Sequence, residues 1–283
     1  MLLACVLFAL MANCVYAASR LAVPVAASVI SFVRVSVNLA ALLLPAMVAG
    51  NLRGLFGDLR LALWLRGLFG GVSLMLSFAS IQRIGPGESA FLTASSGIFV
   101  AALGPWVLSQ RNSLRDWLAI AGAVAGMVLL FRPGLDAVDL TGRLMGVLSG
   151  FLAALAYLMI ARAGRSNPPA TVVFYFCLVA VLFHLVWFAW SGFALPAGGM
   201  AWTWSLTAGI AGSAAQLLLT RAYQLAPAIL VSAVGYSAPV MSMLMGIAFF
   251  GETPDSTALI GCGLILACGV ALPFLAVRRL RPG

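Results

Sequence analysis

The chain is dominated by apolar stretches that are each about as long as a bilayer is thick. A helix needs about 20 mostly apolar residues to cross the hydrocarbon core of a membrane. Hydropathy, together with Pro, Gly and Arg punctuation, divides the sequence into ten such stretches. Hydrophobic residues make up 63% of the chain and charged residues only 8%, too few to cover the surface of a soluble domain. We therefore predict an all-α integral membrane protein.

The ten predicted transmembrane helices follow one another with short connections, which leave no room for a separate soluble domain. The first stretch lacks the basic residues that begin a secretory signal peptide, so we interpret it as a transmembrane helix. The predicted ranges are 1–19, 25–49, 61–81, 87–109, 114–131, 141–161, 168–191, 200–223, 228–250 and 256–277.

The basic side chains indicate the orientation of these helices. The net charge is +9, and all of the positive charge is arginine. No basic cluster is interleaved with aromatic residues on a polar surface, which argues against binding of nucleic acid. Arginines gather in cytoplasmic loops of membrane proteins, and this bias predicts that both termini are cytoplasmic. The arginines predicted on the outer side are Arg20, Arg83, Arg132 and Arg143. The arginines predicted in the cytoplasmic loops and tail are Arg53, Arg60, Arg66, Arg111, Arg115, Arg162, Arg165, Arg221, Arg278, Arg279 and Arg281.

The cysteines predict neither disulfides nor a metal site. All five lie inside apolar stretches, and the sequence contains no CxxC pair and no Cys/His cluster with the spacing of metal ligands. We therefore expect no cofactor.

The second half of the sequence is a weak copy of the first, displaced by about 141–143 residues. In this alignment Tyr16 falls on Tyr157, and the polar residues of span three fall on those of span eight. Each copy contains five spans, and an odd number inverts the second copy in the membrane. We predict two inverted five-helix repeats, residues 1–140 and 141–283, an architecture in which many secondary transporters bind substrate between the repeats.

Several weak motifs accompany this duplicated plan. They are Asn13, Arg34, the Ala79/Pro86 and Ala222/Pro227 junctions, Pro239, the Gly251-Glu252 ending of span nine and the Gly261/Gly269 pair. With them, nearly the whole chain resembles the drug/metabolite transporter superfamily, in its ten-span branch of EamA-type permeases. The resemblance implies export of small metabolites, most of all neutral or aromatic amino acids, through the bacterial inner membrane by alternating access. The chain departs from the family pattern at Gln110-Arg111, where a Gly-Glu ending is common, and at Gly97-Ile98, where Pro is common.

The candidate substrate-binding residues are polar or aromatic side chains within the spans. Arg34 lies in the middle third of span two, where a charge must face protein or water. It either contacts a substrate carboxylate or bonds to Asn13 and helix carbonyls. Each serine either lines a cavity or serves helix packing. The candidates are Asn13, Tyr16, Arg34, Ser73, Ser77, Ser80, Thr93, Ser96, Tyr157, Gln216, Thr220, Tyr223 and Tyr236.

Other ionisable residues bear on the transport mechanism. His184 is either a titrating switch or, as we favour, a neutral hydrogen-bonded core residue. All carboxylates fall in loops or at helix ends, which disfavours proton antiport through a buried acid, with Glu88 as the best exception. They are Asp58, Glu88, Asp116, Asp136, Asp139, Glu252 and Asp255.

Two alternatives to an amino-acid exporter remain open. One is a multidrug or other-metabolite exporter of the same fold, although a lining of hydroxyls, an amide and an arginine suits zwitterions or anions better than cations. The other is an intramembrane enzyme, which would need a nucleophile with a base or a metal. The predicted partners are a small-molecule substrate and membrane lipid. The glycines of spans five and ten leave open whether the protein is a monomer or a homodimer: Gly122, Gly126, Gly261, Gly263 and Gly269.

Overall fold

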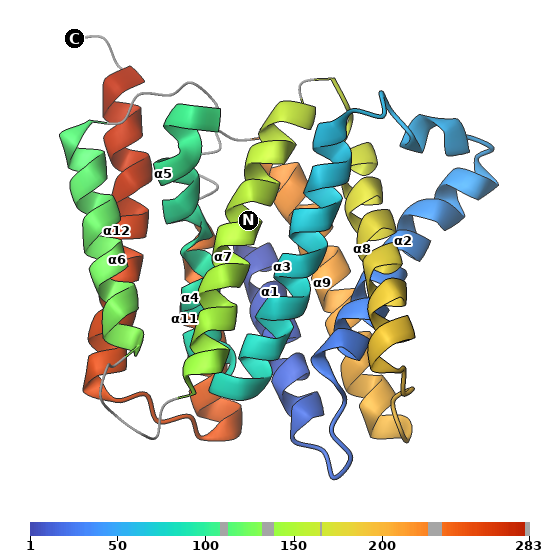
Figure 1. The fold of residues 1–283 in the computed structure, drawn as a ribbon, viewed down its shortest axis with the longest axis horizontal. Coiled ribbons are helices and arrows are strands. Elements are labelled where there is room, and N and C mark those ends of the chain that lie inside the picture. The colour runs from blue at the N-terminus through green and yellow to red at the C-terminus, as the bar shows by residue number, and fades with distance from the viewer. Residues whose placement is uncertain (108–112, 132–138, 165, 226–233, 281–283) are drawn as a thin grey trace.

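The protein is a bundle of helices (Figure 1). The structure, a computed structural model, describes residues 1–107, 113–131, 139–164, 166–225 and 234–280, and contains no strand among them. The helices are α1 (Leu2–Ser19), α2 (Ala27–Val48), the short 3-10 helix η1 (Leu52–Leu55), α3 (Leu61–Ile84), α4 (Pro86–Ala94), α5 (Ser96–Val107), α6 (Leu114–Phe131), α7 (Leu140–Ala163), α8 (Pro169–Ser191), α9 (Gly199–Leu225), α11 (Ser237–Phe250) and α12 (Ser256–Leu280).

The length and polarity of these helices confirm the predicted fold class. Within the described ranges, 6 helices are long and apolar enough to cross a membrane. Large apolar side chains lie exposed on the outside of the bundle, as expected where lipid takes the place of water; Trp190, for example, is 94% exposed. One predicted span, 87–109, is divided at Ser95 into α4 and α5. Part of the span 228–250 falls outside the described residues.

The two halves of the sequence are packed into each other. Each of the three buried apolar clusters takes residues from both halves; one, for example, joins Ile98 and Ile120 to Ile265. In Figure 1, α6 and α12 form a pair at one edge of the bundle, while α1, α3 and α7 lie further in. The buried core therefore lies between the predicted repeats as well as within them. The inversion of the second repeat stays a prediction.

The most extensive contact between two helices joins α3 to α7. The Ser73 hydroxyl donates to the carbonyl of Ser149 at 2.8 Å, and the Ser149 hydroxyl donates to the carbonyl of Ser73 at 2.9 Å. Two small residues face each other here, so the backbones can approach closely enough for both bonds. Ser73 therefore holds two helices together.

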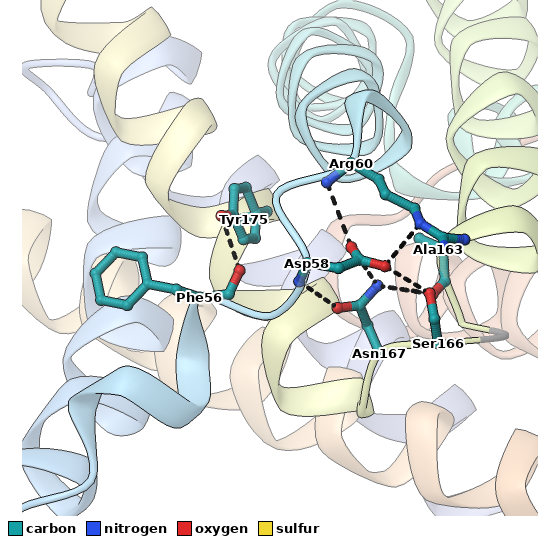
Figure 2. A network of polar contacts seen from close by, with 7 residues as sticks. All are labelled: Phe56, Asp58, Arg60, Ala163, Ser166, Asn167 and Tyr175. Carbon is teal, nitrogen blue, oxygen red and sulfur yellow. Dashed lines mark hydrogen bonds and ion pairs between the residues drawn. The ribbon is translucent and has the colours of Figure 1, made fainter.

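A polar network ties the α2–α3 loop to the α7–α8 loop (Figure 2). Asp58 accepts from the Asn167 side-chain amide at 2.8 Å and from the Ser166 hydroxyl at 2.7 Å, while its backbone N–H donates to Asn167 Oδ1 at 3.1 Å. Arg60 lies 2.8 Å from the same carboxylate. The hydrogen bond from Ser166, together with those from Asn167 and Arg60, holds the pKa of Asp58 below its usual value. The carboxylate is thus stabilised in its charged form.

The same region fixes the beginning of α3 against α8. The Tyr175 hydroxyl donates to the carbonyl of Phe56 at 3.0 Å (Figure 2). The Tyr175 ring meets Trp64 edge to face, with centroids 5.1 Å apart. An edge-to-face pair of this kind adds about 0.5–1.5 kcal/mol beyond its apolar burial. These contacts set the position of the first turns of α3, where Arg66 lies.

Candidate functional site

Arg34 lies inside α2 and is nearly enclosed by protein, with 5% of its surface exposed. Its guanidinium lies over the ring of Phe78, with Cζ 6.0 Å from the centroid. The arginine side chain reaches toward α9 across Gly212, where a Cβ would lie 2.6 Å from Arg34 Nε. The glycine thus provides the space that the guanidinium occupies. The structure shows no hydrogen bond between Arg34 and Asn13. Such a bond was part of the structural role considered for the arginine.

Arg66 is a second buried arginine, and its assignment to a cytoplasmic loop was wrong. It lies inside α3, only 4% exposed. Its guanidinium lies over the ring of Phe176 in α8, with Cζ 4.4 Å from the centroid. A side chain on Gly70 would collide with Arg66 Nη1. Both arginines are therefore accommodated in the same way, beside an aromatic ring and over a glycine.

Neither buried arginine has a carboxylate partner in the part of the chain that the structure describes. The ion pairs there are made by Arg60, Arg83 and Arg143. The Nε atoms of Arg34 and Arg66 are buried without a hydrogen-bond partner. The two arginines are close enough to interact electrostatically, and the phenol of Tyr157 in α7 is within electrostatic range of both. These three residues form what we call the arginine site: Arg34, Arg66 and Tyr157.

The two candidates of α1, Asn13 and Tyr16, make their polar contacts with other residues. The amide nitrogen of Asn13 donates to the Ala9 carbonyl at 2.8 Å and contacts the Ser242 carbonyl of α11 at 3.5 Å. Tyr16 accepts a hydrogen bond from Arg20, whose guanidinium also lies 4.7 Å from the tyrosine ring centroid. The repeat partners Tyr16 and Tyr157 thus lie in different surroundings.

The hydroxyl residues of α3, α4 and α5 lie at helix contacts. Ser73 bonds to α7 as described above, and Ser77 and Thr93 contact each other at 3.4 Å. Ser80 is fully buried, and its oxygen lies 3.0 Å from where a Cβ would stand on Gly146 of α7. Ser96 is also buried, at the beginning of α5.

The remaining candidates belong to the second half of the chain. Gln216 is buried in α9, one turn beyond Gly212, the glycine that Arg34 crosses. Tyr236 is buried between the glycines at 97 and 269. The side chains of Thr220 and Tyr223 lie outside the described part of the structure. The Gln110-Arg111 corner lies outside it as well.

His184 is a fully buried structural residue. Its Nδ1 lies 2.7 Å from the Ala180 carbonyl, and its Nε2 lies 2.9 Å from the Ser31 hydroxyl. A carbonyl can only accept, so Nδ1 carries the proton, and Nε2 of the neutral ring accepts from Ser31. Both ring nitrogens are engaged, as expected of a neutral core histidine.

Glu252 differs from the other acids at its end of the bundle. Glu88 pairs with Arg143 at 2.5 Å and Asp139 with Arg83 at 2.8 Å. Glu252 instead reaches, from the loop after α11, into a half-buried slot beside Gly85 and accepts from the backbone N–H of Gly87. Burial raises the pKa of Glu252 to about 7; the Glu88 charge raises it too, while Gly87 and Arg20 act in the opposite direction.

The raised pKa of Glu252 predicts how stability changes with pH. An unfolded glutamate titrates near pH 4.3. Between that pH and about 7 the folded state holds a proton that the unfolded state has lost. Stability from this group is therefore complete below the unfolded pKa and is lost as pH rises through the folded pKa. We expect Glu252→Gln, which has no charge to bury, to unfold at nearly the wild-type temperature at pH 5 and at a higher temperature at pH 8. A constant difference across this range would contradict the prediction.

A surface cavity of about 530 Å³ lies elsewhere, where the loop before α2 meets the end of α8. Its lining includes Pro24, Ser28, Trp187 and Pro196, and none of the candidate site residues. The arginine site is therefore a separate feature inside the bundle.

A helical bundle with apolar outer surfaces and buried charges in its interior is typical of a multi-pass membrane protein. The model of the EamA-like transporter family matches residues 1–132 and 140–274. The chain belongs to the EamA-like transporter family, as the motifs had indicated.

Several relatives of the chain are named transporters. It is 27% identical to the pseudopaline exporter CntI of Pseudomonas aeruginosa, over 70% of each protein. It is 29% identical to the threonine/homoserine exporter RhtA of Escherichia coli, over 72% of this chain and 68% of that one. A riboflavin transporter of Vibrio cholerae is 25% identical over 62% and 58%. A solved crystal structure has the same fold, with a TM-score of 0.69, 17% identity and coverage of 99% and 96%.

Proposed function

We propose that the protein exports small metabolites that carry a carboxylate, neutral and aromatic amino acids among them, across the bacterial inner membrane. Substrate would bind between two inverted five-helix repeats that open alternately to the two sides. Both termini would face the cytoplasm, in agreement with the distribution of loop arginines.

One observation carries the carboxylate specificity. Arg34 is a buried cation that no described carboxylate neutralises. An unpaired charge in this environment is costly, by about 3 kcal/mol even on the lenient insertion scale. A guanidinium matches a carboxylate geometrically, with two parallel hydrogen bonds. A substrate carboxylate is the partner that this site lacks.

The duplicated architecture supports alternating access. The family model matches two successive segments of similar length. The helices are also interrupted at corresponding places, because Ser95 and Tyr236 each occupy a turn and lie 141 residues apart in the chain. Broken helices near the midplane are typical of transporters with inverted repeats.

The alternatives fit the structure less well. Buried arginines repel the bulky cations that a multidrug exporter would carry. An intramembrane enzyme needs an activated nucleophile or a metal, but both nitrogens of His184 are engaged by Ser31 and Ala180. In addition, the described residues contain no group of three potential metal ligands.

Counterflow with the purified protein in proteoliposomes tests the proposal. The vesicles are preloaded with threonine or phenylalanine, or with phenethylamine, which is phenylalanine without its carboxylate. We expect the two amino acids to accelerate exchange of labelled phenylalanine over protein-free vesicles, and the amine to have no effect. Equal exchange of the amine would refute carboxylate recognition. Acceleration by the amine, an organic cation, and not by the amino acids would instead favour the multidrug alternative.

A further inference from the structure

We propose that Arg34 and Arg66 together form a binding site for a substrate with two anionic groups, so that dianionic metabolites are the preferred cargo. This inference rests on the proposed function and extends it, because one carboxylate accounts for only one of the two arginines.

Two buried positive charges require two negative partners. Both arginines are at least nine-tenths buried, both have an unpartnered Nε, and they lie close enough to repel each other. A single bound carboxylate would neutralise one guanidinium and leave the other uncompensated in a medium of low dielectric. A ligand with two negative groups would neutralise both and remove their mutual repulsion.

Both guanidinium groups lie over aromatic rings. Arg66 Cζ is 4.4 Å from the centroid of Phe176, and Arg34 Cζ is 6.0 Å from that of Phe78. A guanidinium is planar and carries its N–H donors at its edge, the side that recognises carboxylate or phosphate in a bidentate manner. The aromatic ring also offsets part of the cost of burying the charge.

The surroundings of the two arginines leave space for these side chains. Gly212 lies beneath Arg34 and Gly70 beneath Arg66, and a methyl group at either position would encounter arginine atoms. The Asp58 network and Tyr175 fix the beginning of α3 and, with it, Arg66 (Figure 2). Tyr157, which is 43% exposed, brings a hydroxyl within range of both charges.

The chemistry of the arginine site accepts two carboxylates, or a carboxylate and a phosphate. Matched pairs of amino acids separate these cases. Glutamate and glutamine, or aspartate and asparagine, differ mainly in one negative charge, and O-phosphoserine adds a phosphate to serine. Counterflow in proteoliposomes gives the ratio of dianionic to monoanionic transport for each pair.

We expect wild-type protein to transport at least one dianionic member about tenfold faster than its matched partner, the factor that one charge-assisted hydrogen bond supplies. In Arg66→Met this ratio is expected to fall to about one. Arg53→Met removes an exposed arginine, causes the same change in net charge, and is expected to keep the wild-type ratio. Preference for O-phosphoserine alone would identify phosphate as the second group.

These experiments distinguish a failure of the proposed function from a failure of the two-anion site. If no amino acid exchanges, the proposed function fails and the two-anion site fails with it. If both members of every pair exchange at equal rates, or if Arg66→Met lowers both equally, only the two-anion site is refuted. If Arg66→Met does not fold, the two-anion site is tested instead by the thermal stabilisation that ligands give the wild-type protein in detergent. Succinate must then raise its unfolding temperature more than butyrate does, and equal shifts with the two ligands would refute the two-anion site.

Discussion

Replacement of Arg34 by methionine is expected to have opposite effects on transport and on stability. Counterflow of carboxylate substrates is expected to fall by about 10- to 100-fold, because a charge-assisted hydrogen bond is worth about 1.5–3 kcal/mol. The unfolding temperature in detergent is expected to rise, by about 2–4 °C for each kcal/mol recovered. Methionine fills much of the same volume without the cost of an unpaired buried charge.

The exposed Arg53 provides a matched control for the Arg34→Met substitution. Arg53→Met changes an exposed arginine in η1 and is expected to leave both quantities near their wild-type values. A lower unfolding temperature in Arg34→Met would show that the arginine stabilises the fold. It would then have the structural role that the sequence had left open.

Gly126→Ala is expected to destabilise the protein by about 1–3 kcal/mol, the usual cost of overpacking. Gly126 lies in α6 where this helix crosses α12. An added Cβ would stand 2.8 Å from the carbonyl oxygen of Gly261 and 3.1 Å from the backbone nitrogen of Ile265. Backbone atoms cannot move away by a change of rotamer, as a flexible side chain can, so α6 and α12 must move apart. Thermal unfolding in detergent measures the loss.

The same substitution on the facing helix provides the matched control. At Gly263 in α12 a Cβ would meet nothing within 4 Å. Gly263→Ala is therefore expected to be neutral or stabilising, by up to about 1 kcal/mol of helix propensity. Equal destabilisation by the two alanines would show that close packing of α6 on α12 is not the cause.

The positions of the helices could be predicted from the sequence because apolar length and backbone breakers determine them locally. Gly85, with a φ of 87°, ends α3, and Pro86 begins α4. The division at Ser95 could not be predicted, since no Pro or Gly stands at the break itself and the nearest glycine, Gly97, lies inside α5. The mixing of both halves in each buried cluster also depends on packing between distant segments, which a repeat in the sequence does not specify.

The site was only partly predictable for a related reason. Arg34 lies in the middle of an apolar span, so the free-energy cost of burying its charge can be recognised from the sequence. Arg66 lies five residues into α3, where an arginine ordinarily marks the cytoplasmic end of a helix. Its burial follows from the close approach of α8. The glycines at 67, 70 and 71 are the signal that was missed, because Gly67 and Gly71 let α8 approach α3 closely and Gly70 leaves space for the Arg66 guanidinium.

The paired serines of α3 and α7 restrict how the bundle can change shape. Ser73 belongs to the first half of the chain and Ser149 to the second, and each hydroxyl is bonded to the other's backbone. Sliding of one half past the other along this line would break both bonds in a place that water does not reach. If the protein opens to the two sides of the membrane as proposed, α3 and α7 are therefore expected to move together as one rigid unit.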